Sequence, residues 1–376
     1  MSTKNELKIF VDGYLLNKEH QGTKTYIREL YKEFAKENSD VLIFIGCFKD
    51  LEVEKEFSDF KNIQFIYFKQ SSRILRMFFE IPKIISTYQF QYAHFQYVIP
   101  FVKSKSCKYI VTIHDILFND FKQYFSSSYR LKRNLLFKYS AKKADFLLTV
   151  SKYSKDRIKE YYKLQFKDIF ITPNGVNSEY FKEYNKQEAI DYISKKFSIK
   201  NYLLYVSRIE PRKNQQALLK VFLELENKEI QLVFIGVKSL DNKQFDEQLK
   251  ELTAEQSSKI HILQDISDED LLFFYKGAKA FVYPTLAEGF GIPPLEAAAL
   301  KIPVLSSNKT AMKDFQFLAP NLIDIHNFDV FKNRLNIILE KKDAHHLDQV
   351  QNYIQLHYNW KKSSDIITDI IKNNTL

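Results

Sequence analysis

Two glutamates, Glu288 and Glu296, stand eight positions apart in the stretch YPTLAEGFGIPPLEAAALKIPV, which runs from Tyr283 to Val304. A pair of carboxylates can bind the hydroxyl groups of a sugar or a ribose, because carboxylate oxygens accept hydrogen bonds. The same pair can cleave a glycoside, as acid and nucleophile, when the two groups lie roughly 5–9.5 Å apart. Both kinds of chemistry require the two side chains to reach one site.

The residues around the pair predict a strand, a loop and a helix in that order. Ala280–Tyr283 indicates a buried strand, residues 288–291 the loop that leaves it, and Leu295–Leu300 a helix rich in Leu, Ala and Glu. Pro293 or Pro294 suits the first helical position, where a missing N–H costs nothing. The glutamates then lie at the carboxyl end of a strand, which is the edge where open α/β sheets bind ligands.

Basic residues follow another predicted strand, Tyr202–Ser207, in the run Arg208-Ile-Glu-Pro-Arg-Lys213-Asn214. Arginine can bind phosphate oxygens in a fork and lysine acts as a point charge, so Arg208 and Lys213 suit a diphosphate. Glu296 suits the two hydroxyls of a ribose. A hydrolase of neutral glycans has no use for these cations, which disfavours the glycosidase alternative.

The bulk composition restricts the class of protein. A chain of 376 residues is too long for one ordinary core and predicts two domains. No charged-then-apolar leader opens the sequence, and the longest apolar run, Val41–Phe48, is far short of the roughly 20 residues of a transmembrane helix. Two cysteines make neither a disulfide framework nor a metal cluster, so we expect a cytoplasmic protein.

Candidate strands and helices alternate along the chain, which predicts parallel sheets with helices on both faces. The pattern restarts after the Lys182–Lys200 segment, so two Rossmann-like α/β domains are expected. Strands are expected at Lys8–Val11, Val41–Phe48, Ile63–Phe68, Tyr92–Phe95, Tyr109–Ile113, Phe146–Val150, Ile169–Thr172, Tyr202–Ser207, Leu232–Gly236, Phe281–Pro284 and Val304–Ser306, and helices at Thr25–Glu37, Tyr129–Ala144 and Ser363–Lys372.

Three further residues in the first half lie next to predicted strands or helices. His114 and Asp115 directly follow the strand Tyr109–Ile113; such a histidine is often only structural, but the adjacent carboxylate favours a function. Gly22 precedes a predicted helix and would let the backbone approach a phosphate, with a plain loop glycine as the alternative.

Positive charge is concentrated in residues 61–170, which hold 21 Lys and Arg against 7 Asp and Glu, in a chain of net charge +10. Such a segment can bind nucleic acid, an anionic membrane or a phosphorylated ligand. Within it, Ser71–Tyr88 mixes basic and apolar side chains and could lie in a membrane interface. A core helix with a solvated edge is the alternative, and Pro82 is expected to interrupt either helix.

The order Arg208, Lys213-Asn214, then Glu288 and Glu296 around Gly-Phe-Gly resembles the retaining GT-B glycosyltransferases, family 4-like (group 1), of the bacterial mannosyl- and rhamnosyltransferase type. The resemblance covers the chain from Gly13 to Trp360. It implies a GT-B fold of two Rossmann-like domains that face an interdomain cleft: an acceptor-side domain at 1–185, a nucleotide-sugar domain at 186–358, and a C-terminal helix at 359–376 that returns to the first domain.

The resemblance also implies roles for individual residues. Arg208 and Lys213 would hold the diphosphate, and Glu288 would contact the transferred sugar. The backbone N–H groups of the loop would meet sugar hydroxyls and phosphate. His114 would lie on the sugar or acceptor side of the cleft. The expected catalytic residues are His114, Asp115 and Glu288, and the expected donor-binding residues are Gly22, Arg208, Lys213, Phe290, Gly291, Ile292 and Glu296.

The implied activity is transfer of a hexose, from GDP-mannose, to a glycan or lipid-linked oligosaccharide in cell-surface polysaccharide synthesis, at the inner face of the bacterial plasma membrane. Retention of configuration follows from the resemblance. No Asp-x-Asp stands at a strand end, so neither a metal nor another cofactor is expected. The alternatives are a UDP- or dTDP-sugar donor, and a catalytically silent GT-B protein that binds a membrane or a partner. A nucleic-acid partner is not expected.

Overall fold

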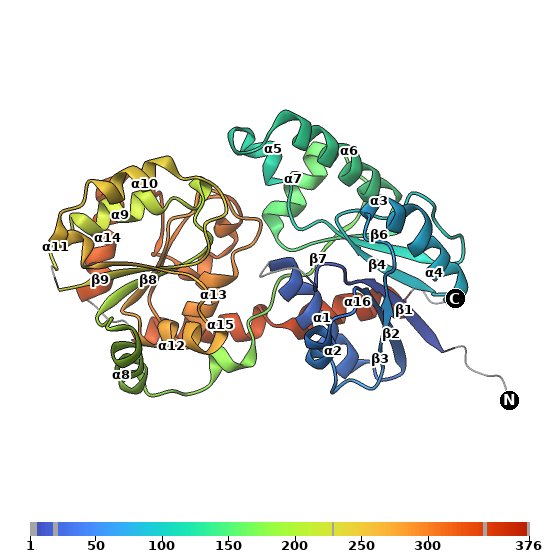
Figure 1. Ribbon diagram of the computed structural model, residues 1–376, viewed down its shortest axis with the longest axis horizontal. Helices are drawn as coiled ribbons and strands as arrows, with labels where there is room; N and C mark the ends of the chain where they lie inside the picture. Colours follow the sequence, from blue (N-terminus) through green and yellow to red (C-terminus); the bar gives the residue numbers. More distant parts are fainter. Residues whose placement is uncertain (1–5, 18–21, 228, 341–343, 374–376) are drawn as a thin grey trace. The chain divides into compact units, whose positions relative to one another are not determined.

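The computed structural model describes residues 6–17, 22–227, 229–340 and 344–373, and it divides the chain into two compact units (Figure 1). Unit 1 comprises Met1–Gly175 and Asn359–Leu376, and unit 2 comprises Val176–Tyr358. Each unit contains one sheet whose strands pair in parallel, as the alternation of strands and helices predicted.

Unit 1 has the sheet order β3-β2-β1-β4-β5-β6-β7, which reverses direction between β1 and β4. The strands are β1 (Leu7–Asp12), β2 (Val41–Cys47), β3 (Ile63–Tyr67), β4 (Tyr92–Gln96), β5 (Lys108–Thr112), β6 (Phe146–Thr149) and β7 (Ile169–Ile171). The helical segments are α1 (Gly22–Glu37), α2 (Leu51–Glu56), α3 (Arg73–Leu75), the π-helical turn η1 (Arg76–Glu80), α4 (Ile81–Tyr88), α5 (Leu117–Asp120), the 3-10 turn η2 (Lys122–Tyr124), α6 (Ser127–Lys143), α7 (Lys152–Tyr162) and α16 (Trp360–Lys372).

Unit 2 has the sheet order β10-β9-β8-β11-β12-β13, which reverses between β8 and β11. The strands are β8 (Tyr202–Val206), β9 (Gln231–Ile235), β10 (Ile260–Leu263), β11 (Ala280–Tyr283), β12 (Val304–Ser307) and β13 (Leu322–Ile323). The helical segments are the 3-10 turn η3 (Ser178–Phe181), α8 (Lys186–Phe197), η4 (Pro211–Lys213), α9 (Gln215–Leu223), α10 (Lys243–Lys250), α11 (Ala254–Ser257), α12 (Asp268–Gly277), α13 (Ile292–Ala299), η5 (Thr310–Asp314), η6 (Gln316–Leu318), α14 (Phe328–Glu340) and α15 (Ala344–His357).

Local chemistry explains where several of these helices begin. Ser151 caps α7 by accepting a hydrogen bond from the N–H of Ser154, at 3.0 Å. Ser267 caps α12 in the same way through the N–H of Asp270, at 3.1 Å. The acidic first turn of α12 adds a favourable interaction with the helix dipole.

Two predictions about proline were wrong. Helix α13 begins at Ile292, so Pro293 and Pro294 are its second and third residues; their missing N–H groups would be unpaired there in any case. Pro82 does not interrupt the helical path of residues 73–88, because the chain widens into the π-helical turn η1 immediately before α4.

Gly22, which was expected in a loop, is the first residue of α1.

Candidate active site

Two loops of unit 2 meet where its sheet order reverses. One follows β8 and the other follows β11, and both leave the carboxyl ends of adjacent parallel strands. The N–H of Leu286 donates to the carbonyl of Arg212 at 2.8 Å, and Asn214 Nδ2 donates to the carbonyl of Pro284 at 3.0 Å. These hydrogen bonds hold the two loops together at the position where open α/β sheets bind ligands.

Lys213 and Glu288 form a buried ion pair across these loops, with the ammonium group donating to Glu288 Oε1. The same carboxylate oxygen accepts hydrogen bonds from Tyr283 Oη at 2.7 Å and Thr285 Oγ1 at 3.2 Å. Two residues that follow different strands in the sequence are therefore brought into direct contact.

The charges around Glu288 control its protonation. Burial by itself would raise the pKa of Glu288, but the cations of Lys213 and Arg212 outweigh it and hold the pKa at about 2. Burial lowers the pKa of Lys213, and the carboxylate of Glu288 opposes that shift. Glu288 is therefore an anion at neutral pH, and it provides negative charge beside the buried lysine.

Arg212 is a part of this site that the sequence analysis missed. Its Nη1 lies 3.5 Å from Glu288 Oε2 and donates to the carbonyl of Ala287 at 2.7 Å. Its Nη2 lies 2.5 Å from Glu210 Oε1. Glu210 and Arg212 lie between Arg208 and Lys213, directly after a predicted strand. Their position beside a strand end was the signal that could have identified them.

The loop before α13 presents backbone donors. In the described part of the chain, the N–H groups of Phe290, Gly291 and Ile292 make no hydrogen bond, and they lie at the N-terminus of this helix. The side chain of Phe290 is buried against Phe315 and Tyr358, so Phe290 offers a ligand its backbone rather than its ring.

The two remaining donor-binding candidates differ in their surroundings. Arg208 is exposed, and its guanidinium makes no ion pair or hydrogen bond to the residues that the structure describes. Glu296 lies on α13 and accepts a hydrogen bond from Tyr275 Oη at 2.9 Å. Burial, with the negative charges of Asp268 and Glu179, raises the pKa of Glu296 to about 7.

In unit 1, His114 follows β5 and its ring is held between neighbours. Its Nε2 lies 2.9 Å from Gln96 Oε1; because an amide oxygen only accepts, Nε2 carries the proton and Nδ1 keeps a lone pair. Tyr26 packs edge-on against the imidazole at 4.8 Å between ring centroids. Burial lowers the pKa of His114 to about 3, so the ring is neutral at pH 7. Asp115 accepts the N–H of Leu117 at 3.1 Å.

Three buried polar atoms near the strand ends of unit 1 have no hydrogen-bond partner in the described structure: Asp12 Oδ1, Gln96 Nε2 and Asn174 Oδ1. Burial raises the pKa of Asp12 to about 6, against the opposing charges of Arg76 and Arg73. Such unpaired groups are costly unless a ligand or water satisfies them. The strand-end position that singled out His114 would also have identified Asp12 and Gln96.

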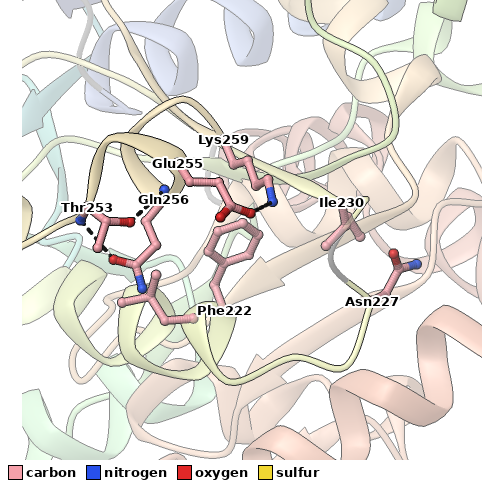
Figure 2. A pocket seen from close by; sticks show the side chains of 8 residues that line it. Phe222, Asn227, Ile230, Thr253, Glu255, Gln256 and Lys259 are labelled. Atoms are coloured by element: carbon pink, nitrogen blue, oxygen red, sulfur yellow. Dashed lines mark hydrogen bonds and ion pairs between the residues drawn. The ribbon is translucent and has the colours of Figure 1, made fainter.

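A pocket of about 230 Å³ lies elsewhere in unit 2, between α9 and α11 (Figure 2). Four of its polar side chains are paired with one another: Glu255 binds Lys259 at 2.8 Å, and Thr253 and Gln256 form a reciprocal helix cap. The pocket contains none of the predicted site residues. In the described chain, no group of three or more His, Cys, Asp or Glu side chains could hold a metal ion.

Comparisons with known proteins agree with this arrangement of two units. Residues 20–180 match the family model of Glycosyltransferase Family 4, and residues 186–355 match that of Glycosyl transferases group 1. The O-antigen chain mannosyltransferase B of Escherichia coli is 31% identical over 175 residues, which cover 46% of this chain and 45% of that protein. The O-antigen chain mannosyltransferase RfbU of Salmonella typhimurium is 30% identical over 218 residues, which cover 56% and 54% of the two chains.

The matched region therefore spans about half the length of these curated relatives. Among solved structures, the sucrose-phosphate synthase of Thermosynechococcus elongatus superposes with a TM-score of 0.76 at 15% identity, covering 98% of each chain. At that identity the superposition shows a shared fold.

Proposed function

This chain belongs to the group 1 and family 4 glycosyltransferases, and we propose that it transfers a hexose from a nucleotide sugar to a glycan acceptor. The observation that carries the proposal is the buried Lys213–Glu288 pair, held where the sheet of unit 2 reverses its order. A nucleotide sugar contains a diphosphate, a ribose and a sugar rich in hydroxyls. This edge of unit 2 offers a matching group for each of them.

The diphosphate would bind at the N-terminus of α13. The free N–H groups of residues 290–292 and the positive end of the helix dipole both favour an anion there. Arg208 and Lys213 add two positive charges on the neighbouring loop. These groups would stabilise the negative charge that develops on the leaving diphosphate as the bond to the sugar breaks.

The two glutamates would bind the two sugars of the donor. Glu288 is anionic at neutral pH and is fixed by Tyr283 and Thr285, so it can accept hydrogen bonds from hydroxyls of the transferred hexose. Glu296 would accept those of the ribose. We further propose that the acceptor attacks from the face that the diphosphate leaves, with a diphosphate oxygen assisting its deprotonation, which retains the anomeric configuration.

Unit 1 would contribute acceptor-side groups. Neutral His114 can accept a proton or a hydrogen bond at Nδ1, because Gln96 fixes the proton on Nε2. The unpaired atoms of Asp12 and Gln96 would be satisfied by hydroxyl groups of the sugars. Asp115, whose carboxylate accepts a backbone N–H, would shape the loop that follows His114.

The proposed donor is GDP-mannose, and the proposed acceptor is a glycan or a lipid-linked oligosaccharide of cell-surface polysaccharide synthesis. The support comes from the relatives, since both are named as O-antigen chain mannosyltransferases. A UDP- or dTDP-sugar is the alternative donor for the same site. We propose transfer without a metal ion, because Arg208, Lys213 and the helix N-terminus can supply positive charge to the diphosphate.

Calorimetric titration of the full chain with GDP, UDP, dTDP, ADP and their sugar conjugates, with and without EDTA, tests the donor. Arg208→Ala should weaken binding by about tenfold or more, because a charge-assisted contact is lost. Lys200→Ala is the matched control, since Lys200 is exposed and precedes the same strand at its other end.

We expect GDP and GDP-mannose to bind selectively, with affinities that EDTA does not change. Selective binding of a uridine or thymidine nucleotide would show that the donor is a UDP- or dTDP-sugar and not GDP-mannose. If no nucleotide bound, the chain would instead be a catalytically silent protein of this fold. Mannose transfer to a lipid-linked acceptor, with the anomeric configuration read by NMR, tests the reaction itself.

A further inference from the structure

Exposed apolar side chains gather on three segments of unit 1. They lie on α3 and η1, on the loop between β4 and β5, and on α6. Phe79 is 68% exposed, Val102 57% and Leu131 64%. We call this set the apolar ridge; its members are Ile74, Leu75, Phe78, Phe79, Phe101, Val102, Leu131 and Leu135.

Aromatic contacts join the three segments into one surface. The rings of Phe78 and Phe101 stack at 4.8 Å between centroids with an interplanar angle of 17°. Phe101 packs in turn against Tyr139 of α6, also at 4.8 Å, and Tyr139 Oη donates to the carbonyl of Phe101 at 3.1 Å. Residues 78, 101 and 139 are distant in sequence, so only the folded unit creates this surface.

The surroundings of the ridge are basic and almost free of acidic side chains. Helix α6 (Ser127–Lys143) contains six Lys and Arg and no Asp or Glu. The loop at 97–107 contains Lys103 and Lys105 and no acidic residue, although Lys103 is paired with Asp145 at 2.6 Å. Glu80 is the one acidic residue of Ser71–Tyr88, and its carboxylate accepts the N–H groups of Lys69 and Gln70.

The structure also decides which basic residues face solvent. Arg76, which looked like part of a basic membrane-binding segment, is only 3% exposed and lies 5.1–5.4 Å from the ring centroids of Tyr14, Phe48 and Phe68. Lys132 and Lys138 of α6 are exposed beside Leu131 and Leu135. Lysines that flank exposed apolar side chains match the surface of a bilayer, where anionic headgroups lie above apolar acyl chains.

We propose that the apolar ridge inserts into the headgroup–acyl boundary of an anionic bilayer, with the lysines of α6 on the headgroups. Each Lys or Arg near an anionic leaflet is attracted by the negative headgroups, and burial of the apolar side chains adds to this attraction. No helix in the described residues is long and apolar enough to cross a membrane. Contact with one leaflet does not require a helix that crosses the membrane. The proposal is independent of the transfer chemistry and needs no substrate.

Co-sedimentation of the full chain with vesicles tests it. One set contains phosphatidylglycerol and phosphatidylethanolamine, and the other contains phosphatidylcholine alone. The ridge variant is Phe79→Ser/Val102→Ser/Leu131→Ser, and the charge variant is Lys132→Glu/Lys138→Glu. The control is Phe166→Ser, because Phe166 is fully exposed between Lys163 and Lys167 of the same unit but is not in the ridge.

We expect at least about tenfold tighter binding to the anionic vesicles, weakened by salt, and a loss of about tenfold or more in the ridge and charge variants. Phe166→Ser should bind like the unaltered chain. Circular dichroism verifies folding, and Phe79→Ser alone substitutes if the triple variant is unfolded.

Absence of binding to anionic vesicles, or undiminished binding by the ridge variant, would overturn the proposal. GDP affinity, measured in parallel, should be the same in all variants. A chain that binds vesicles but no nucleotide would retain this inference and lose the proposed function, so the two failures are distinguishable.

Discussion

At the residue scale, the candidate site depends on how charges are paired in a buried setting. Glu288 is satisfied by Lys213, Tyr283 and Thr285, and Arg212 lies within reach of its second oxygen. Removing one partner of such a pair leaves an uncompensated charge in the interior, which costs more than the pair itself contributes. The pair is therefore a stability element as well as a binding element.

Glu288→Gln should lower the free energy of unfolding by about 3–5 kcal/mol, because the buried Lys213 loses its counter-ion. Adding Lys213→Met should recover part of that loss, since no unpaired charge remains. Urea unfolding followed by circular dichroism measures the double variant and each of the two single variants. If the double variant were as unstable as the sum of the two single ones, the ion pair would not be the cause.

The pKa of Glu296, about 7 against an ordinary value of 4.5, gives two pH effects of opposite sign. The folded protein binds this proton more tightly than the unfolded chain, so the stability from Glu296 is present below pH 4.5 and is lost as pH rises to about 7. GDP affinity should rise over roughly pH 6–8, the range around the pKa of Glu296, because the ionised carboxylate is the better acceptor for ribose hydroxyls. Glu296→Gln should remove both dependences in calorimetry and urea unfolding; an unchanged affinity profile would reject the ribose role.

At the element scale, the loop between β11 and α13 owes its shape to one glycine. Gly291 has a φ of +103° and is the N-cap of α13. A Cβ at this position would lie 2.2 Å from Met312 Cε. The conformation of Gly291 at the start of α13 is thus available to glycine and strained for other residues.

Gly291→Ala should therefore destabilise the protein by more than about 1 kcal/mol and weaken GDP binding. Alanine is strained at this positive φ, and its Cβ would collide with Met312. Gly22→Ala is the matched control for stability, because no atom of the described residues lies within 4 Å of a Cβ there. Thermal unfolding and calorimetry read the two effects. A Gly22→Ala protein of normal stability and normal GDP affinity would remove Gly22 from the donor site.

At the scale of the whole molecule, the C-terminal helix α16 completes unit 1, as predicted. Trp360 packs on Tyr26 at 6.2 Å, Ser363 Oγ donates to the carbonyl of Pro173 at 2.6 Å, and Tyr92 Oη donates to the carbonyl of Ile371 at 3.0 Å. The chain therefore enters unit 2 after Gly175 and returns to unit 1 at Asn359.

Ile367→Ala should destabilise unit 1 by about 2–5 kcal/mol, because the side chain is fully buried on α16 and its loss leaves a cavity. Trp360 is the chain's one tryptophan, and its fluorescence reports this unit during urea unfolding. The exposed Lys362→Ala on the same helix serves as the control. A fluorescence transition that did not move would show that α16 contributes little to unit 1.

The fold class, most of the strands and the segments that carry Arg208, Lys213, Glu288 and Glu296 could be predicted from the sequence, whereas the strands β10 and β13 were not predicted. Those features are local: strands are short apolar runs, caps lie within one turn, and strand ends mark ligand-binding edges. The same strand-end rule, applied more widely, would have reached Asp12 and Gln96.

Which of these groups touch depends on the folded chain. It paired Lys213 with Glu288 across 75 residues, turned Arg76 inward while leaving Phe79 exposed, and left polar atoms of Asp12 and Gln96 unpaired. Partners, burial and pKa values depend on contacts between segments that are distant along the chain. Spacing cannot specify them, because they arise when strands pair and loops from different strands pack together.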